Sequence, residues 1–225
     1  LVADREKVFE ESLYNVIGRS KKLMFERKLD EGALLLDDVK LTYTYRWGKA
    51  YRGEKKRLVD KVDEKHSYLA ASAEKGSETT GPLYAWFNES LHLLPMGVSN
   101  ISEKYLISQL TEHPDWVQQL INFLWSVDIT DIRDIRVKDD RLIFIHTNVT
   151  QHYASFFSLE SLSLRRLCLI GVAFFESFTK PKTLIIDDFG MLLHPDVLCH
   201  IVEIFESGNA ACNSQMLVVD CNPSL

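Results

Sequence analysis

The segment KTLIIDDFGMLLHP, residues 182–195, contains residue types that could bind a metal ion and activate water. Its apolar run, 184–186, is typical of a buried strand and leads directly into two adjacent carboxylates, Asp187 and Asp188. Nucleotide hydrolases need one carboxylate that holds Mg²⁺ and a second acid that orients the attacking water. Asp187 fits the first role and Asp188 the second.

A second apolar run strengthens this interpretation. Residues 215–220, QMLVVD, end in Asp220 and are followed by Cys221. Ligands of open α/β sheets lie at the carboxyl ends of the strands, so both strands point their polar residues to one edge. The pattern alone leaves an alternative open, because many buried strands end in solvated acids that bind nothing.

The sequence pattern around these residues predicts a parallel βαβ arrangement. A strand over 183–187, an amphipathic helix over 196–207 and a strand over 215–220 have the spacing of such a unit. Before them, the segment ESLSLRRLCLIGVAFFESF is apolar on nearly every side after its first turn, which predicts a helix buried among neighbours.

The first part of the chain has a different pattern. Alternation in VKLTYTYRW, residues 39–47, predicts a half-buried antiparallel strand, and KVFEESLYNV and KKLMFERKL predict two more. Leu58, Val62, His66 and Leu69 predict one surface helix within 54–75. Further helical patterns follow in LYAWFNESLHLL and after Pro114-Asp115, and a hairpin turns at Asp139-Asp140.

These patterns divide the chain into three segments. We expect an antiparallel β-subdomain over 1–53, a helical insert over 54–130 and a portion of an α/β core over 131–225. The chain starts at Leu1 and stops at Leu225 directly after a strand-like run. We therefore expect a fold that is incomplete at both ends.

Composition excludes several classes of protein. The formal charge of −6 argues against a nucleic-acid binder that uses its whole surface, although a local basic patch remains possible. The basic cluster RGEKKR, 52–57, is mixed with acids and favours a solvated helix face. No apolar stretch is long enough for a membrane span. The cysteines show no metal or disulfide spacing, which favours reduced thiols in a cytoplasmic protein.

The pieces SLESLSLRRL, TLIIDDFGMLLHP and MLVVDCNPSL together resemble the C-terminal half of ABC/SMC-like ATPases of the OLD type, which occur in bacterial antiphage and DNA-transaction proteins. The resemblance implies an α/β fold of the P-loop NTPase class, ABC type, with a β-subdomain and a helical insert. It also implies a homodimer or higher oligomer that closes around ATP and Mg²⁺ to gate an effector protein or DNA.

The resemblance assigns roles residue by residue. Asp187 matches the Walker B aspartate that holds the metal, and Asp188 matches the catalytic glutamate. Cys221 takes the place of the switch histidine. The signature segment, which faces the γ-phosphate bound by the other subunit, corresponds to Ser161, Ser163 and Arg165.

Three of these positions depart from the family pattern. Asp188 is one methylene shorter than glutamate, and a misplacement of ~1 Å can cost on the order of 100-fold in rate. Ser163 replaces a glycine that lets the backbone approach phosphate, and the Cys221 thiol is a poor substitute for imidazole. These departures favour an alternative, a decayed pseudo-ATPase that serves as a dimerisation or regulatory scaffold.

A phosphate-binding loop is missing from the printed sequence. The pattern GxxxxGK[ST] does not occur in residues 1–225, so this chain alone should not hydrolyse ATP. In the resembling family this loop precedes the β-subdomain, which implies that it would lie before Leu1. A third reading, a plain interaction domain without nucleotide, also stays open.

Overall fold

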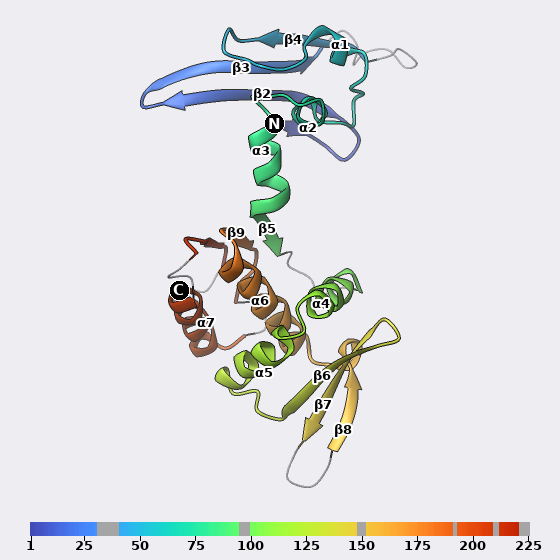
Figure 1. Cartoon of the computed structure of the whole chain (residues 1–225). Helices are drawn as coiled ribbons and strands as arrows, with labels where there is room; N and C mark the ends of the chain where they lie inside the picture. Colours follow the sequence, from blue (N-terminus) through green and yellow to red (C-terminus); the bar gives the residue numbers. More distant parts are fainter. Residues whose placement is uncertain (31–40, 95–99, 148–151, 191–192, 209–211, 221–225) are drawn as a thin grey trace. The chain divides into compact units, whose positions relative to one another are not determined.

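The computed structural model describes residues 1–30, 41–94, 100–147, 152–190, 193–208 and 212–220. The chain is mixed α/β and forms two compact units, Leu1–Asn88 (unit 1) and Glu89–Leu225 (unit 2). The division falls inside the segment 54–130 that the sequence assigned to one helical insert, and the boundary expected at 130/131 lies within unit 2. Figure 1 colours both units along the sequence.

Unit 1 is built on a four-stranded antiparallel sheet in the order β1-β2-β3-β4. The strands are β1 (Val2–Ala3), β2 (Val8–Ile17), β3 (Ser20–Leu29) and β4 (Tyr43–Trp47). The two long strands confirm the prediction from KVFEESLYNV and KKLMFERKL. Tyr43, Tyr45 and Trp47 of β4 are half-buried while Thr44 and Arg46 are exposed, as the alternation predicted.

The single helix predicted over 54–75 is wrong. The structure has two short helices instead, α1 (Lys56–Val59) and α2 (Tyr68–Glu74). The Ser67 hydroxyl caps α2 by accepting a hydrogen bond from the Ala70 N–H at 3.2 Å, so a new helix begins there. The apolar stripe did predict the core correctly at Leu58 and Val62, which pack with Phe25, Tyr51 and Tyr68.

The helix predicted over LYAWFNESLHLL is also only partly correct. Helix α3 (Gly81–Ala85) continues as a π-helical turn, Trp86–Ser90, but the last four residues form strand β5 (Leu91–Leu94). This strand belongs to unit 2 and lies beside β9 (Thr183–Ile186) in a parallel sheet. The first half of the chain therefore contributes a strand to the α/β sheet.

Unit 2 places helices and two sheets around helix α6 (Leu162–Thr179). The parallel sheet has the order β10-β9-β5, with α7 (Pro195–Gly208) connecting β9 to β10 (Gln215–Val218). This confirms the predicted βαβ unit. The remaining elements are α4 (Asn100–Glu112), α5 (Trp116–Ser126), the antiparallel strands β6 (Ile132–Lys138), β7 (Arg141–Thr147) and β8 (His152–Phe156), and a 3-10 turn, Phe157–Leu159.

Helix α6 forms the centre of the core of unit 2, as its all-round apolar pattern predicted. Phe174 of α6 lies 6.3 Å from the ring of Phe123 in α5 and 5.0 Å from the ring of Phe205 in α7, centroid to centroid. Cys168 is fully buried in the same cluster. Packing against α5 and α7 fixes the axis of α6 and therefore also the position of its N-terminus.

The hairpin predicted at Asp139-Asp140 is confirmed by the pairing of β6 with β7, and both aspartates have positive φ as a type I′ turn requires. Within the described residues, no helix combines the length and apolar character that a bilayer crossing would need.

Candidate functional site

The two predicted acids lie in a tight turn directly after β9. Asp187 and Asp188 are both half-buried. The Asp188 N–H donates to Oδ1 of Asp187 at 3.1 Å, and Asp188 has a φ of +46°, in the left-handed region. Aspartate is among the few non-glycine residues that visit this region readily. The sequence thus placed both carboxylates correctly at the carboxyl end of a buried parallel strand.

The end of β10 joins this turn. Strand pairing continues past both strands, since the Val219 N–H donates to the Ile186 carbonyl and the Phe189 N–H donates to the Val219 carbonyl, each at 3.0 Å. The Gly190 N–H then donates to Oδ2 of Asp220. Three carboxylates, those of Asp187, Asp188 and Asp220, therefore belong to one small edge of the sheet, as expected for parallel strands.

The predicted signature segment is the N-terminus of α6. Ser161 is the N-cap: it is exposed, and its hydroxyl accepts a hydrogen bond from the Leu164 N–H at 3.2 Å. Ser163 is half-buried in the first turn. The guanidinium carbon of Arg165 lies 5.8 Å from the centroid of the Phe157 ring, and Nε of Arg165 is buried with no hydrogen-bond partner in the described part of the chain. A helix start of this kind offers amides and a positive dipole to an anion.

Arg166 connects the helix start to the acids, a contact that the sequence did not predict for this residue. Its residue exposure is 1%, and its Nη2 donates to the carbonyl oxygen of Asp187 at 2.6 Å and to that of Asp188 at 3.4 Å. Burial lowers the pKa of Arg166, and the charges of Asp188 and Asp187 oppose that effect. A double arginine one turn into a buried helix was the available signal, but only the structure distinguishes the inward Arg166 from Arg165.

Two further residues, Cys221 and His194, belong to the segments that carry the family resemblance. Cys221 lies outside the described residues. His194 is exposed; its Nδ1 accepts a hydrogen bond from the Asp196 N–H at 3.3 Å, directly before α7. This contact agrees with a structural role for the His-Pro pair at the start of that helix.

The acid edge suits magnesium better than a metal that needs several protein ligands. Among the described residues, no group of three or more histidine, cysteine or acidic side chains is arranged to hold a metal ion. Mg²⁺ commonly binds through one or two carboxylates, water and substrate phosphates. Asp187 fits this requirement as a half-buried carboxylate whose Oδ1 is held by the hydrogen bond from the Asp188 N–H.

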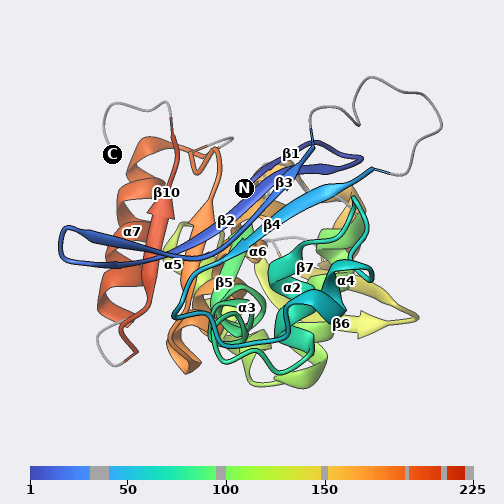
Figure 2. The same cartoon turned by 90° about the horizontal axis from the view of Figure 1, so that it is seen from above.

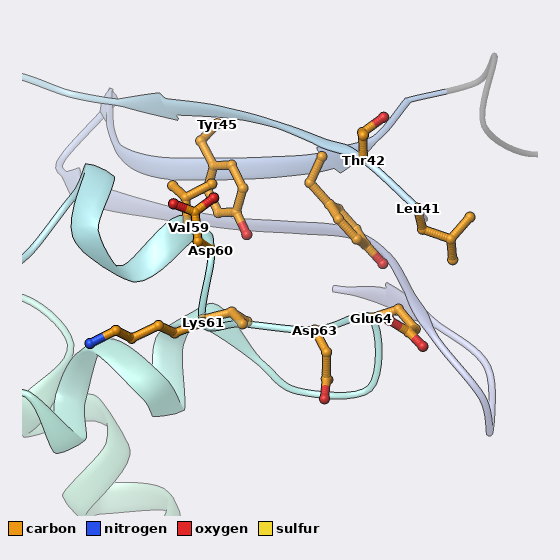
Figure 3. Close-up of a pocket in the computed structure, with 10 residues that line it drawn as sticks. Leu41, Thr42, Tyr45, Val59, Asp60, Lys61, Asp63 and Glu64 are labelled. Atoms are coloured by element: carbon orange, nitrogen blue, oxygen red, sulfur yellow. The ribbon is translucent and has the colours of Figure 1, made fainter. Parts of the chain in front are cut away.

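A pocket of about 400 Å³ lies elsewhere, in unit 1, between β4 and residues 59–64. Figure 3 shows Tyr45 pointing into it, with Asp60, Asp63 and Glu64 at its rim. The Tyr45 hydroxyl is buried without a hydrogen-bond partner among the described residues. None of the predicted site residues lines this pocket.

Compared with known proteins, the chain matches no family model and no curated protein sequence at a significant level.

Proposed function

We propose that this chain is a portion of an ABC/SMC-like ATPase of the OLD type, with the P-loop NTPase fold of that class. In this proposal, two copies close around ATP in the cytoplasm and gate an effector protein or DNA, in a setting such as antiphage defence. The supporting observation is the Arg166 contact with the carbonyls of Asp187 and Asp188. It ties the helix start and the acid pair into one rigid framework.

The residues have distinct roles in this proposal. Asp187 would hold Mg²⁺, and Asp188 would orient the water that attacks the γ-phosphate. Bound Mg²⁺ would neutralise charge on the phosphates. Ser161 and Ser163, with Arg165, would present donors and a helix dipole to the γ-phosphate held by the other copy, and Cys221 would stand near it.

A specific observation favours the pseudo-ATPase alternative. Asp188 is short for its role, and its backbone is fixed in the left-handed region by the turn and by Arg166. A general base must come within hydrogen-bond reach of the water, about 2.6–3.2 Å. If Asp188 cannot reach that position, the same framework would still bind and dimerise without turnover.

The test begins with the coding sequence on either side of the region for residues 1–225. A GxxxxGK[ST] loop that joins this chain supports the proposal, and a parent protein without any such loop contradicts both nucleotide readings. In a loop-containing parent, Asp188→Asn should lower ATP turnover by on the order of 10²- to 10⁴-fold while ATP binding stays unchanged. Asparagine also tolerates positive φ, so the turn should persist.

Asp196→Asn is the matched control, because that carboxylate is almost fully exposed in the first turn of α7. It should leave turnover unchanged. Wild-type protein that dimerises with ATP but does not hydrolyse it would identify the scaffold alternative. If the protein neither binds ATP nor responds to it, the interpretation that remains is a plain interaction domain without nucleotide.

A further inference from the structure

The β2–β3 hairpin of unit 1 extends beyond the rest of its sheet. Residues 14–17 pair with residues 20–23, whereas β4 pairs only with residues 25–29 of β3 and β1 only with residues 8 and 10 of β2. The last four pairs therefore form a two-stranded ribbon, which Figure 2 shows reaching past the end of β4. Gly18, with a φ of +58°, provides the tight two-residue turn at its tip.

The ribbon is basic and exposed. Arg19, Lys21 and Lys22 are all exposed, and the nearest acids in the two strands are Glu11 and Glu26, near the base of the hairpin. Val16 and Ile17 at the tip are 62% and 67% exposed. This local excess of positive charge contrasts with the formal charge of −6 for the whole chain.

An open groove of about 590 Å³ lies at the base of the ribbon, within unit 1. Its lining includes Tyr14, Asn15, Arg52 and Trp86, and Trp86 is 38% exposed. Nζ of Lys21 lies 4.0 Å from the centroid of the Tyr14 ring, so a ribbon cation stands at the edge of this groove. Aromatic faces and cations are thus combined at one surface.

A close backbone contact adds one more cation. The Gly48 N–H donates to the Met24 carbonyl at 2.9 Å, and a Cβ on Gly48 would overlap the carbonyl oxygen of Leu23. Glycine therefore lets the 48–52 loop lie directly on β3, which brings the exposed Arg52 into the groove lining. None of the four cations of the ribbon and the groove lining (Arg19, Lys21, Lys22 and Arg52) forms an ion pair within the described residues, and Glu78 is the acidic residue in the groove lining.

We propose that the ribbon and this groove form a binding surface for single-stranded nucleic acid, DNA or RNA. Cations contact the phosphates while unpaired bases stack on Trp86 and Tyr14, the combination that single-strand binding surfaces use. A duplex keeps its bases stacked inside, where Trp86 could not reach them. A membrane surface could take up Val16 and Ile17 at the tip, but the cations and polar residues of the groove would have no role in it. This proposal is independent of the nucleotide proposal above.

The test measures binding of the 1–225 chain to a fluorescent oligothymidylate and a fluorescent oligouridylate, each of about 20 nucleotides, by anisotropy. A blunt duplex of the same length and vesicles of phosphatidylserine with phosphatidylcholine are the comparison ligands. The chain should prefer the single strands, and the logarithm of affinity should fall with the logarithm of salt by roughly 0.7 per phosphate contacted. The DNA and RNA arms identify the source of the strand.

Two variants locate the surface. Trp86→Ala should weaken binding by roughly 5- to 150-fold, the range for the loss of one base–aromatic stack. Trp125→Ala is its control in unit 2, at a similar exposure of 37%, and should bind normally. The double variant Lys21→Glu, Lys22→Glu should weaken binding at least as strongly and reduce the salt slope. Lys55→Glu with Lys56→Glu makes the same change in charge outside the groove lining and should have a much smaller effect.

Circular dichroism and thermal melting establish that each variant is folded. The proposal is overturned by the absence of single-strand binding at low salt, by equal binding of duplex with no effect of Trp86→Ala, or by equal losses in the two double-lysine variants. Binding to vesicles but not to either oligonucleotide also overturns it and identifies a lipid surface instead.

Discussion

The guanidinium of Arg166 donates a hydrogen bond of 2.6 Å to the main-chain carbonyl oxygen of Asp187, 21 residues further along the chain. A buried cation at the start of α6 thereby holds the turn that carries both candidate catalytic acids. The Phe189 N–H of the turn also donates a hydrogen bond to the carbonyl of Val219, directly after β10. The geometry of the turn depends on three elements that meet only in the folded protein.

Replacement of this arginine tests the framework directly. Arg166→Met should lower the free energy of unfolding by about 3 kcal/mol, because two buried carbonyls lose a charged donor. Arg136→Met is the control: that guanidinium is exposed and pairs with Asp134, so its loss should cost at most about 1 kcal/mol. Urea unfolding measures both values, and similar losses would contradict the framework role.

His146 provides a pH-dependent contact near the same helix start. Its Nδ1 lies 2.8 Å from Oδ2 of Asp131 and its Nε2 lies 2.9 Å from Oε1 of Glu160, the residue before Ser161. Burial disfavours the charged ring, but the two carboxylates outweigh it and raise the pKa of His146 above its ordinary value of 6.5. The stabilisation is therefore complete below pH 6.5 and is lost as the pH rises through the higher folded-state pKa.

The stability advantage of wild type over His146→Gln should accordingly shrink as the pH is raised, in urea unfolding measured at several pH values. An NMR titration of the ring should give a pKa above 6.5. His200→Gln is the control, since the side chain of His200 is 44% exposed and contacts Glu203 at 3.4 Å. An advantage that grows with pH would show that His146 is neutral in the fold.

Glu176 should show the opposite pH dependence. Burial tends to raise its pKa, but His92 at 2.7 Å, the Tyr105 hydroxyl at 2.9 Å and Lys182 together lower the pKa of Glu176 below 4.5. This stabilisation is present above pH 4.5 and is lost as the pH falls through the lower folded-state pKa.

Tyr105→Phe should therefore cost about 2 kcal/mol at neutral pH, the range for a hydrogen bond to a charged group, and less in acid. Chemical denaturation at both pH values measures the difference. Tyr153→Phe removes a hydroxyl from an exposed ring and should be nearly neutral. A pH-independent cost for Tyr105→Phe would argue against the ionised Glu176.

The close contact at Gly48 gives a prediction for unit 1. Gly48→Ala would place a methyl group against the Leu23 carbonyl oxygen. The clash is with main-chain atoms, which cannot move aside as a flexible side chain would. We expect a loss of about 3 kcal/mol in thermal or urea unfolding. Gly81→Ala has open space around its Cβ and should be neutral or slightly stabilising. If both variants melt alike, the 48–52 loop does not rest on β3 as described.

The sequence determined the elements whose information is local. Period-2 alternation identified β4, the strand-like runs KVFEESLYNV and KKLMFERKL identified β2 and β3, and apolar runs with an amphipathic helix identified the β9–α7–β10 unit. The same reasoning placed Asp187, Asp188 and Asp220 at one sheet edge and Ser161 at a helix start. In each case the side-chain period or the capping residue lies within a few positions of the element that it specifies.

The tertiary structure decided the rest. Leu91–Leu94 continues a helical pattern and becomes a strand only because residues 183–186 offer a parallel partner. The 54–75 segment breaks where the Glu11 carboxylate accepts hydrogen bonds from the Tyr68 and Leu69 main chain. Arg165 and Arg166 are adjacent and chemically identical, yet it is the guanidinium of Arg166 that donates to the carbonyl of Asp187 in the turn after β9. Such outcomes depend on partners far away in sequence, whose hydrogen bonds outweigh local preference.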